Sequence, residues 1–226
     1  MYVIINGVSS ETLSGVQVLE LPPIIKPRMR RNVDVIDGRA GDIVTKLGYE
    51  AYDKTIRILL HDNYNLDQVV SFFNTKGEII FSNDPFIYQF EVLDEIDFER
   101  AVKFKTAEIT FHVQPYKKSP AQTPKTFTSS GYVTNMGNVL SAPTFDIVGS
   151  GTVTLLIDSI TMLSIDMTDG EIIIDSDAQD AYLNGNLKNR RVTGSYENLR
   201  LTPGRHSISW TGTVSSLTIS EYSRWI

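Results

Sequence analysis

GEIIFSNDPFIYQFEVLDEIDFERAVKFKTAEITFHVQPY, residues 77–116, is the most informative stretch of this 226-residue chain. Two runs within it carry apolar or aromatic residues at every second position: Phe86, Tyr88, Phe90 and Val92, then Ala107, Ile109, Phe111 and Val113. Successive side chains of a strand point to opposite faces, so each run is predicted to be a strand with one face against a core. A charged bend at residues 95–100 is expected to join the two strands.

Upstream of this stretch we expect strands and a long loop or arm. Residues 2–5, 16–21 and 54–60 are rich in β-branched and aliphatic residues, which favours strands. Residues 24–41 mix proline, two glycines and a basic run, and are expected to form a loop or arm with a short strand at 32–36. The basic run consists of Lys26, Arg28, Arg30 and Arg31. Such a cationic loop is either a solvated face or a surface that pairs with acidic residues of a neighbouring subunit.

One helix is predicted between these strands. Its apolar residues recur at positions i, i+3, i+4 and i+7: Leu66, Val69, Val70 and Phe73. Asn65 is the expected N-cap, because its side-chain oxygen can accept a hydrogen bond from a free amide of the first turn. Gly77 is expected to end the helix.

The composition changes after residue 116, where KKSPAQTPKTFTSS is polar and interrupted by prolines. Such a stretch is typical of a connection between domains. We therefore expect an N-terminal domain at 1–116, a linker at 117–134 and a C-terminal domain at 135–226.

The last 90 or so residues are predicted to be all β. Short strands there are expected to be separated by Gly149-Ser150-Gly151, by the hairpin turn Asp169-Gly170 and by the turn Pro203-Gly204. Residues 176–199 look irregular. This spacing favours a β-sandwich of the jelly-roll or galectin-like kind.

The overall composition excludes several classes of protein. The chain has no cysteine, so disulfides, cysteine-ligated zinc and a thiol nucleophile are excluded, and a reducing cytoplasm would suit it. Its formal charge of −6 argues against general nucleic-acid binding, which needs a basic surface. Neither a membrane span of about 20 apolar residues nor a signal peptide is expected.

Histidines and carboxylates show no spacing typical of a catalytic or metal site. The histidines lie far apart in the sequence: His61, His112 and His206. Asp175, Asp177 and Asp180 resemble the start of a calcium loop. Its sixth and twelfth positions need glycine and a bidentate carboxylate, but here they are Asp180 and Asn186. We therefore expect no catalytic residue, no cofactor and no metal.

A carbohydrate-binding, lectin-like module for a host cell-wall saccharide stays open as an alternative function. It would use an aromatic surface made by Trp210, Tyr222 and Trp225, since aromatic rings stack on the apolar face of a sugar. Trp210 also has the parity of a core residue, and an aromatic ring in a strand is most often buried.

A wall-degrading hydrolase is a second alternative. It would need two carboxylates that face one cleft, and the chain offers the pairs Asp94/Glu95 and Asp97/Glu99. Both pairs cluster at the predicted bend, which favours a solvated turn.

Residues 77–116 resemble the signature stretch of the distal tail protein family of siphophages. The resemblance lies in a G-x-hydrophobic-x-FS-x-x-P strand, a tyrosine in the next strand, an IDFER bend and an aromatic strand that closes on QP. The C-terminal part resembles the same family in NMGNVLSAPTFDIVGSGTVTL, IIIDSDAQDAY, PGRHSISWTGTVSSLTI and the final SRWI.

The resemblance implies a mainly β fold. An N-terminal β-sandwich or split-barrel domain with one α-helix and a long loop or arm would precede a C-terminal galectin-like β-sandwich. Six copies would form a ring that docks beneath the last ring of the tail tube protein. The arm would lie at 24–41, with its four basic side chains pairing across the interface between subunits.

The resemblance also implies partners and a location. The ring would hold the tail-associated tip protein and, in several phages, receptor-binding proteins, and its channel would let DNA pass. The protein would be a component of the virion tail tip, or baseplate, of a phage or a phage-tail-like bacteriocin, assembled in the bacterial host cytoplasm. No enzymatic activity, no membrane and no sequence-specific nucleic acid is implied.

Overall fold

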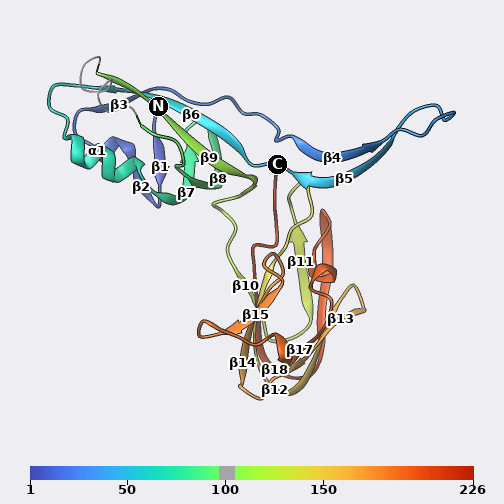
Figure 1. The fold of residues 1–226 in the computed structure, drawn as a ribbon. Coiled ribbons are helices and arrows are strands. Elements are labelled where there is room, and N and C mark those ends of the chain that lie inside the picture. Colours follow the sequence, from blue (N-terminus) through green and yellow to red (C-terminus); the bar gives the residue numbers. More distant parts are fainter. Residues whose placement is uncertain (97–104) are drawn as a thin grey trace. The chain divides into compact units, whose positions relative to one another are not determined.

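The computed structural model describes residues 1–96 and 105–226 (Figure 1). Only Glu95 and Ile96 of the expected bend are among them, so the Asp97/Glu99 pair lies outside the described residues. Contacts within the chain divide it into two compact units, Met1–Pro120 with Ile226, and Ala121–Trp225. The predicted mainly β fold is confirmed, and the boundary between the units falls within the expected linker.

The first unit contains a seven-stranded antiparallel sheet in the order β2-β1-β7-β8-β9-β6-β3 (Figure 1). Its strands are β1 (Val3–Ile5), β2 (Val8–Ser9), β3 (Val16–Glu20), β6 (Tyr52–Leu60), β7 (Lys76–Phe81), β8 (Asp84–Glu91) and β9 (Thr106–Lys118), and a 3-10 turn, η1 (Ser10–Thr12), follows β2. The alternation predicted for the last two strands is confirmed, because Tyr88, Phe90, Phe111 and Val113 are buried in one core. Phe111 lies at its centre, with ring centroids 5.3 Å from Phe90 and 6.0 Å from Phe81.

The predicted helix is α1 (Leu66–Phe73), which buries Val69 and Phe73 against this core. The Asn65 cap is confirmed, since its Oδ1 accepts a hydrogen bond from the Gln68 amide at 3.2 Å. The predicted stop at Gly77 is wrong. The helix ends at the cap residue Asn74, and Gly77 lies inside β7.

Gly77 is needed in β7 for a different reason. Its φ is +135°, which favours glycine, and a Cβ there would lie 2.1 Å from Asn6 Oδ1. The Asn6 side chain fills this space, accepts a hydrogen bond from the Glu78 amide at 2.9 Å and donates one to the Lys76 carbonyl at 3.1 Å. The glycine therefore leaves room for Asn6, in the β1–β2 turn, to form hydrogen bonds with the start of β7.

Between β3 and β6 the chain forms a separate two-stranded sheet, β4 (Met29–Asp34) and β5 (Ile43–Tyr49), which we call the arm (Figure 1). A loop or arm at 24–41 with a short strand at 32–36 was expected from the sequence, and this range is too short because the hairpin continues to Tyr49. The strand β4 begins earlier, and β5 was not predicted. Neither strand faces a core, so the alternation of apolar and polar residues that marks a half-buried strand is absent from both.

The second unit is built around two long strands that bend from one layer into another (Figure 1). In one layer, the start of β12 (Thr144–Ile157) and the end of β18 (Gly204–Ser220) pair with β14 (Glu171–Asp175) and β10 (Lys125–Phe127). In the other, their remaining halves pair with β13 (Ile160–Asp166) and β11 (Gly131–Asn135). The short elements β15 (Asp180–Leu183), β16 (Asn186–Leu187), β17 (Val192–Gly194), η2 (Asn189–Arg191) and η3 (Tyr196–Leu199) complete the unit.

Gly149-Ser150-Gly151 was predicted to separate two strands, and this is wrong. The segment lies within β12, where the register to β18 shifts at Val148/Gly149 and again after Ser150. A Cβ on Gly149 would lie 2.4 Å from the Thr213 carbonyl oxygen, so the two backbones approach too closely for a larger residue. The glycines therefore mark the place where a single strand bends between layers.

Two other segments are more ordered than expected. Residues 125–127 of the expected linker are β10, and its last four residues, 131–134, belong to β11; both strands pair with β18. The irregular segment 176–199 contains the three short strands from β15 to β17 and two 3-10 turns. No helix within the described part of the chain is long and apolar enough to span a membrane.

Candidate assembly surface

The arm is exposed along almost its whole length. Every residue from Arg30 to Leu47 is exposed, and the stretch includes six large apolar side chains: Val33, Val35, Ile36, Ile43, Val44 and Leu47. A two-stranded hairpin without a covering layer is only marginally stable in water. Contiguous exposed apolar surface of this kind marks a site of protein association. The arm is therefore the strongest candidate for an assembly surface.

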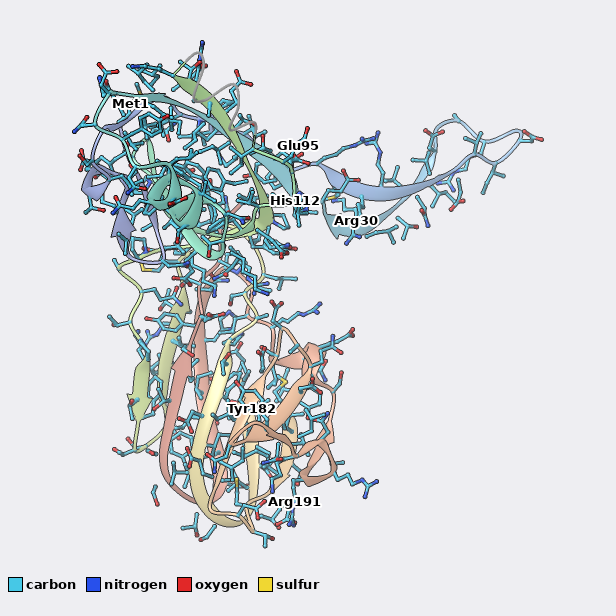
Figure 2. All side chains as sticks on the ribbon, turned by 60° about the vertical axis from the view of Figure 1, so that its left-hand side comes forward. Met1, Arg30, Glu95, His112, Tyr182 and Arg191 are labelled. Atoms are coloured by element: carbon cyan, nitrogen blue, oxygen red, sulfur yellow. The ribbon has the colours of Figure 1, made fainter. Side chains whose placement is uncertain are left out.

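The structure divides the four predicted basic residues between the arm and its base. Arg30 and Arg31 lie on β4, and Figure 2 shows Arg30 on the hairpin. Lys26 and Arg28 precede β4. The Lys26 Nζ lies 5.7 Å from the Tyr49 ring centroid, and the Arg28 carbonyl accepts a hydrogen bond from the Glu50 amide. Among the described residues, none of the four basic side chains forms an ion pair.

A like-charged pair on the arm indicates that its partners come from elsewhere. Arg31 lies directly opposite Lys46, and the next pair on the same face is Val33 with Val44. Like charges directly opposite each other destabilise a sheet. This face, which we call the cationic face, therefore joins an apolar pair to two positive charges that a carboxylate-bearing surface would neutralise.

The charge of the arm contrasts with that of the rest of the chain. The arm together with the segments that flank it, residues 24–50, carries six basic and four acidic side chains, a net charge of +2, whereas the whole chain carries −6. The remaining residues together therefore carry −8. Opposite charge on two surfaces steers their association, so these residues are suited to contact an acidic surface.

The base of the arm is held by two side-chain hydrogen bonds from the first unit. Lys54 is 2% exposed, and its Nζ donates a hydrogen bond to the Pro23 carbonyl at 3.1 Å. Asn83 Nδ2 donates one to the Pro22 carbonyl at 2.9 Å. Burial lowers the pKa of the Lys54 amine and raises the pKa of the neighbouring Tyr88 hydroxyl. These two hydrogen bonds fix the direction in which the chain leaves the sheet toward the arm. Sequence patterns carry no signal for such a contact.

The three aromatic residues proposed for sugar stacking do not form one exposed surface. Tyr222 is 8% exposed, belongs to the core of the second unit and donates its hydroxyl hydrogen bond to the Thr123 carbonyl. Trp210 is partly buried and packs against the same core, as its parity predicted. Trp225 is also partly buried. A sugar ring would therefore find no face of Tyr222 to stack on.

The three histidines lie in separate places. His61 contacts Gln17, His112 pairs with Asp53 at 2.8 Å, and His206 pairs with Asp158 at 2.7 Å. Asp175 Oδ1 accepts two backbone hydrogen bonds of its own turn. The described residues contain no cluster of three or more potential metal ligands.

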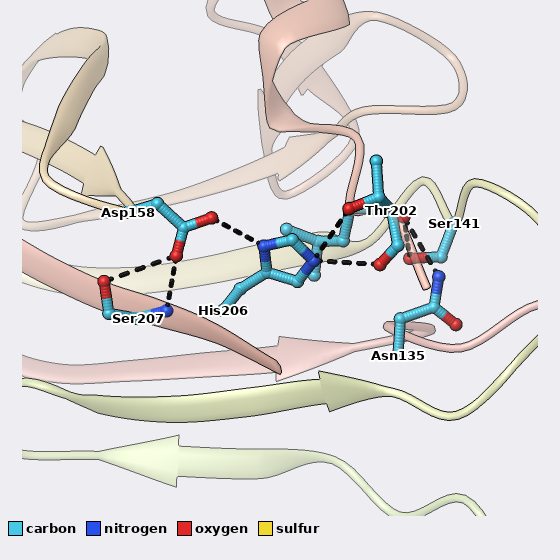
Figure 3. A network of polar contacts seen from close by, with 7 residues as sticks. Asn135, Ser141, Asp158, Thr202, His206 and Ser207 are labelled. Atoms are coloured by element: carbon cyan, nitrogen blue, oxygen red, sulfur yellow. Dashed lines mark hydrogen bonds and ion pairs between the residues drawn. The ribbon is translucent and has the colours of Figure 1, made fainter. Parts of the chain in front are cut away.

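The His206 network connects three segments of the second unit (Figure 3). Its Nδ1 faces the Asp158 carboxylate, and its Nε2 lies 2.8 Å from the Thr202 carbonyl oxygen. Asp158 also accepts a hydrogen bond from the Ser207 amide, and its hydrogen bond with His206 is the main reason why its pKa is lowered. Both ring nitrogens face acceptors, so the network joins the β12–β13 turn to β18.

Comparison with solved structures finds a similar fold in a phage protein. The Dit protein of phage SPP1, described as a paradigm of the hub adsorption apparatus of phages that infect Gram-positive bacteria, matches with a TM-score of 0.67 at 16% identity. The match covers 100% of this chain and 99% of that chain.

Two structures of the phage P2 baseplate in its activated conformation, with Ca and with Sr, match less well. Their TM-scores are 0.49 and 0.48 at 10% and 11% identity, over 94% and 91% of this chain and 91% and 90% of theirs. No protein-family model matches the sequence, and no curated protein matches it. The SPP1 match spans both chains nearly end to end, so this chain has the fold of a phage distal tail protein, in agreement with the family resemblance of its sequence.

Proposed function

We propose that this chain is the structural hub of a long non-contractile phage tail tip. Six copies form a ring that joins the tail tube to the tail-associated tip protein and to receptor-binding proteins, and DNA passes through its channel. The protein acts in the virion by association and not as an enzyme. The match to the SPP1 Dit protein over the whole chain is the observation that carries this proposal.

The arm supports the self-association that a ring requires. Ring closure needs the same two complementary surfaces on every subunit, so that each copy binds the next in one direction. The exposed apolar and cationic arm is suited to be one of these surfaces. Stable interfaces bury about 800 Å² on each partner, an area that an exposed two-stranded hairpin can contribute to substantially.

The solution mass of the purified protein tests the proposal. We expect light scattering over a range of concentrations, followed by electron microscopy, to find rings of six copies, single or stacked. A chain that stays monomeric at all concentrations, and also with its tail tube partner added, would contradict the ring.

Charge reversal tests the role of the arm. Arg28→Glu with Arg30→Glu is expected to abolish rings, because both exposed side chains then repel an acidic partner surface. The matched control reverses two exposed arginines of the second unit, Arg190→Glu with Arg200→Glu, and should leave rings intact. Intact rings in this variant would remove Arg28 and Arg30 from the interface.

A further inference from the structure

The chain contains two Asn-Gly pairs, Asn6-Gly7 and Asn184-Gly185, and the structure places both in the same kind of turn. Asn6 and Gly7 have φ angles of +48° and +82°, and Asn184 and Gly185 have φ angles of +50° and +76°. Each pair is the two-residue loop of a hairpin, β1–β2 in the first unit and β15–β16 in the second. Positive φ at both positions is typical of the type I′ turn, which favours Asn-Gly. All four residues are exposed.

An asparagine that precedes glycine can lose its side-chain amide, because glycine has no Cβ to hinder the approach of its own backbone nitrogen. This nitrogen gives up its proton to water or hydroxide and attacks Cγ of the asparagine. A bond forms between the two atoms, the bond from Cγ to Nδ2 breaks, and Nδ2 leaves as ammonia. Water then opens the resulting five-membered ring at either carbonyl, so that aspartate or isoaspartate replaces asparagine. Water is the only co-reactant.

The Asn6 side chain is held away from this reaction by β7. Its Oδ1 accepts a hydrogen bond from the Glu78 amide at 2.9 Å, and its Nδ2 donates one to the Lys76 carbonyl at 3.1 Å. The Asn6 amide donates a third hydrogen bond to the Glu78 carbonyl at 2.9 Å. The missing Cβ of Gly77 leaves the space in which the side chain lies. The side chain can therefore turn toward the Gly7 nitrogen only after its bonds to β7 break.

The Asn184 side chain has no such contacts. Within the described ranges its side-chain atoms form no hydrogen bond, and its backbone carbonyl accepts one from Asn186 Nδ2 at 3.2 Å. The strand that follows, β16, contains two residues, lies at the end of its sheet and pairs with β15. Leu187 on this strand is 68% exposed. A short strand at a sheet edge opens locally at low cost, so ring closure at Asn184 disrupts little structure.

We propose that Asn184 is a site of spontaneous deamidation and that Asn6, in a turn of the same type, is protected from it. The modification adds one negative charge to a chain whose formal charge is −6. In the isoaspartate product the backbone runs through an additional methylene, which the two-residue turn between Leu183 and Asn186 cannot accommodate. The modification therefore loosens the β15–β16 hairpin. It does not depend on the chain acting as a hub.

Mass spectrometry of peptides from the full chain tests the proposal. The protein is incubated at mildly alkaline pH and digested in acid, and conversion is followed separately at Asn6 and Asn184. In the folded chain we expect Asn184 to convert at least about tenfold faster, because each of the two side-chain hydrogen bonds of Asn6 contributes about fivefold to its protection. In denaturant the two sites should convert at similar rates, because glycine follows both.

Two variants separate the chemistry from the protection. Asn184→Gln is the matched control: its longer side chain would have to close a six-membered ring, so the acidic forms of the protein should disappear. In Gly77→Ala the new Cβ would lie 2.1 Å from Asn6 Oδ1 and displace that side chain, so conversion at Asn6 should rise while Asn184 is unchanged.

The folded wild-type chain decides the proposal whether or not Gly77→Ala folds. Equal rates at the two sites, or faster conversion at Asn6, overturn it. A difference that persists in denaturant would also overturn it, because the cause would then lie outside the fold. Slow conversion of Asn6 in a Gly77→Ala chain with a native circular dichroism spectrum would refute protection by β7.

Discussion

Two buried lysines of the first unit are predicted to differ sharply in their contribution to stability. Lys117 Nζ lies 3.2 Å from an oxygen of Asp84, a carboxylate that is 2% exposed and also accepts the hydrogen bond of Tyr88. Lys54 lies in the same cluster, 4.9 Å from the Tyr88 ring centroid, but its hydrogen bond goes to the Pro23 carbonyl. Methionine has a similar volume to lysine and removes only the charge and the donor.

The expected magnitudes follow from what each replacement leaves behind. Lys117→Met leaves Asp84 buried without its ion-pair partner, which costs about 3–5 kcal/mol of unfolding free energy. Lys54→Met loses a charged hydrogen bond of about 1.5–3 kcal/mol. It also no longer buries an ammonium group, a gain of several kcal/mol that offsets this loss. We therefore expect Lys117→Met to be less stable than Lys54→Met by at least about 2 kcal/mol, the gap between these two outcomes.

Denaturant unfolding of the full chain, followed by circular dichroism, measures this difference. Hydrogen exchange of peptides from β6 to β9 assigns it to the first unit. Lys54→Met should also weaken ring formation while keeping most of its stability, because the base of the arm loses its contact at Pro23. Equal stabilities, or a less stable Lys54→Met, would refute the assignment of the ion pair to Lys117.

Three further outcomes are expected, two in the second unit and one in the core of the first. The lowered pKa of Asp158 means that its contribution to stability is full above the unfolded value of 3.8 and is lost as the pH falls through the folded value. Acid should therefore lower the melting temperature of the second unit, and Asp158→Asn, which breaks the bond to His206, should flatten this dependence below about pH 4. Gly149→Ala should cost about 1–3 kcal/mol through its clash with a carbonyl, more than Gly151→Ala, where φ is +72° but no atom lies within 4 Å. Phe111→Ala should cost about 3–5 kcal/mol in thermal unfolding, since the ring is fully buried among other aromatic rings. A loss below about 1 kcal/mol would contradict its central place in the core.

Local patterns in the sequence were sufficient to predict the helix and the strands that face a core. The helix at 66–73 with its Asn65 cap and the alternating strands around Tyr88 and Phe111 were predicted correctly. Each of these elements is specified by residues that are close together in the sequence. The family resemblance was also readable from the chain alone, because it lies in short motifs such as the one at 77–85.

Only the tertiary structure decided the rest. Gly77 and Gly149 looked like local breaks, but their roles depend on Asn6 and Thr213, which are remote in sequence and supply the atoms that fill the space beside each glycine. The arm was underestimated because a hairpin that faces no core of its own chain carries no alternating pattern. Likewise, Arg31 and Lys46 are 15 residues apart in the sequence, and only the register of the hairpin places their charges opposite each other. A sequence determines which residues can be buried, whereas the fold decides which distant residues meet and which apolar residues stay exposed for a partner.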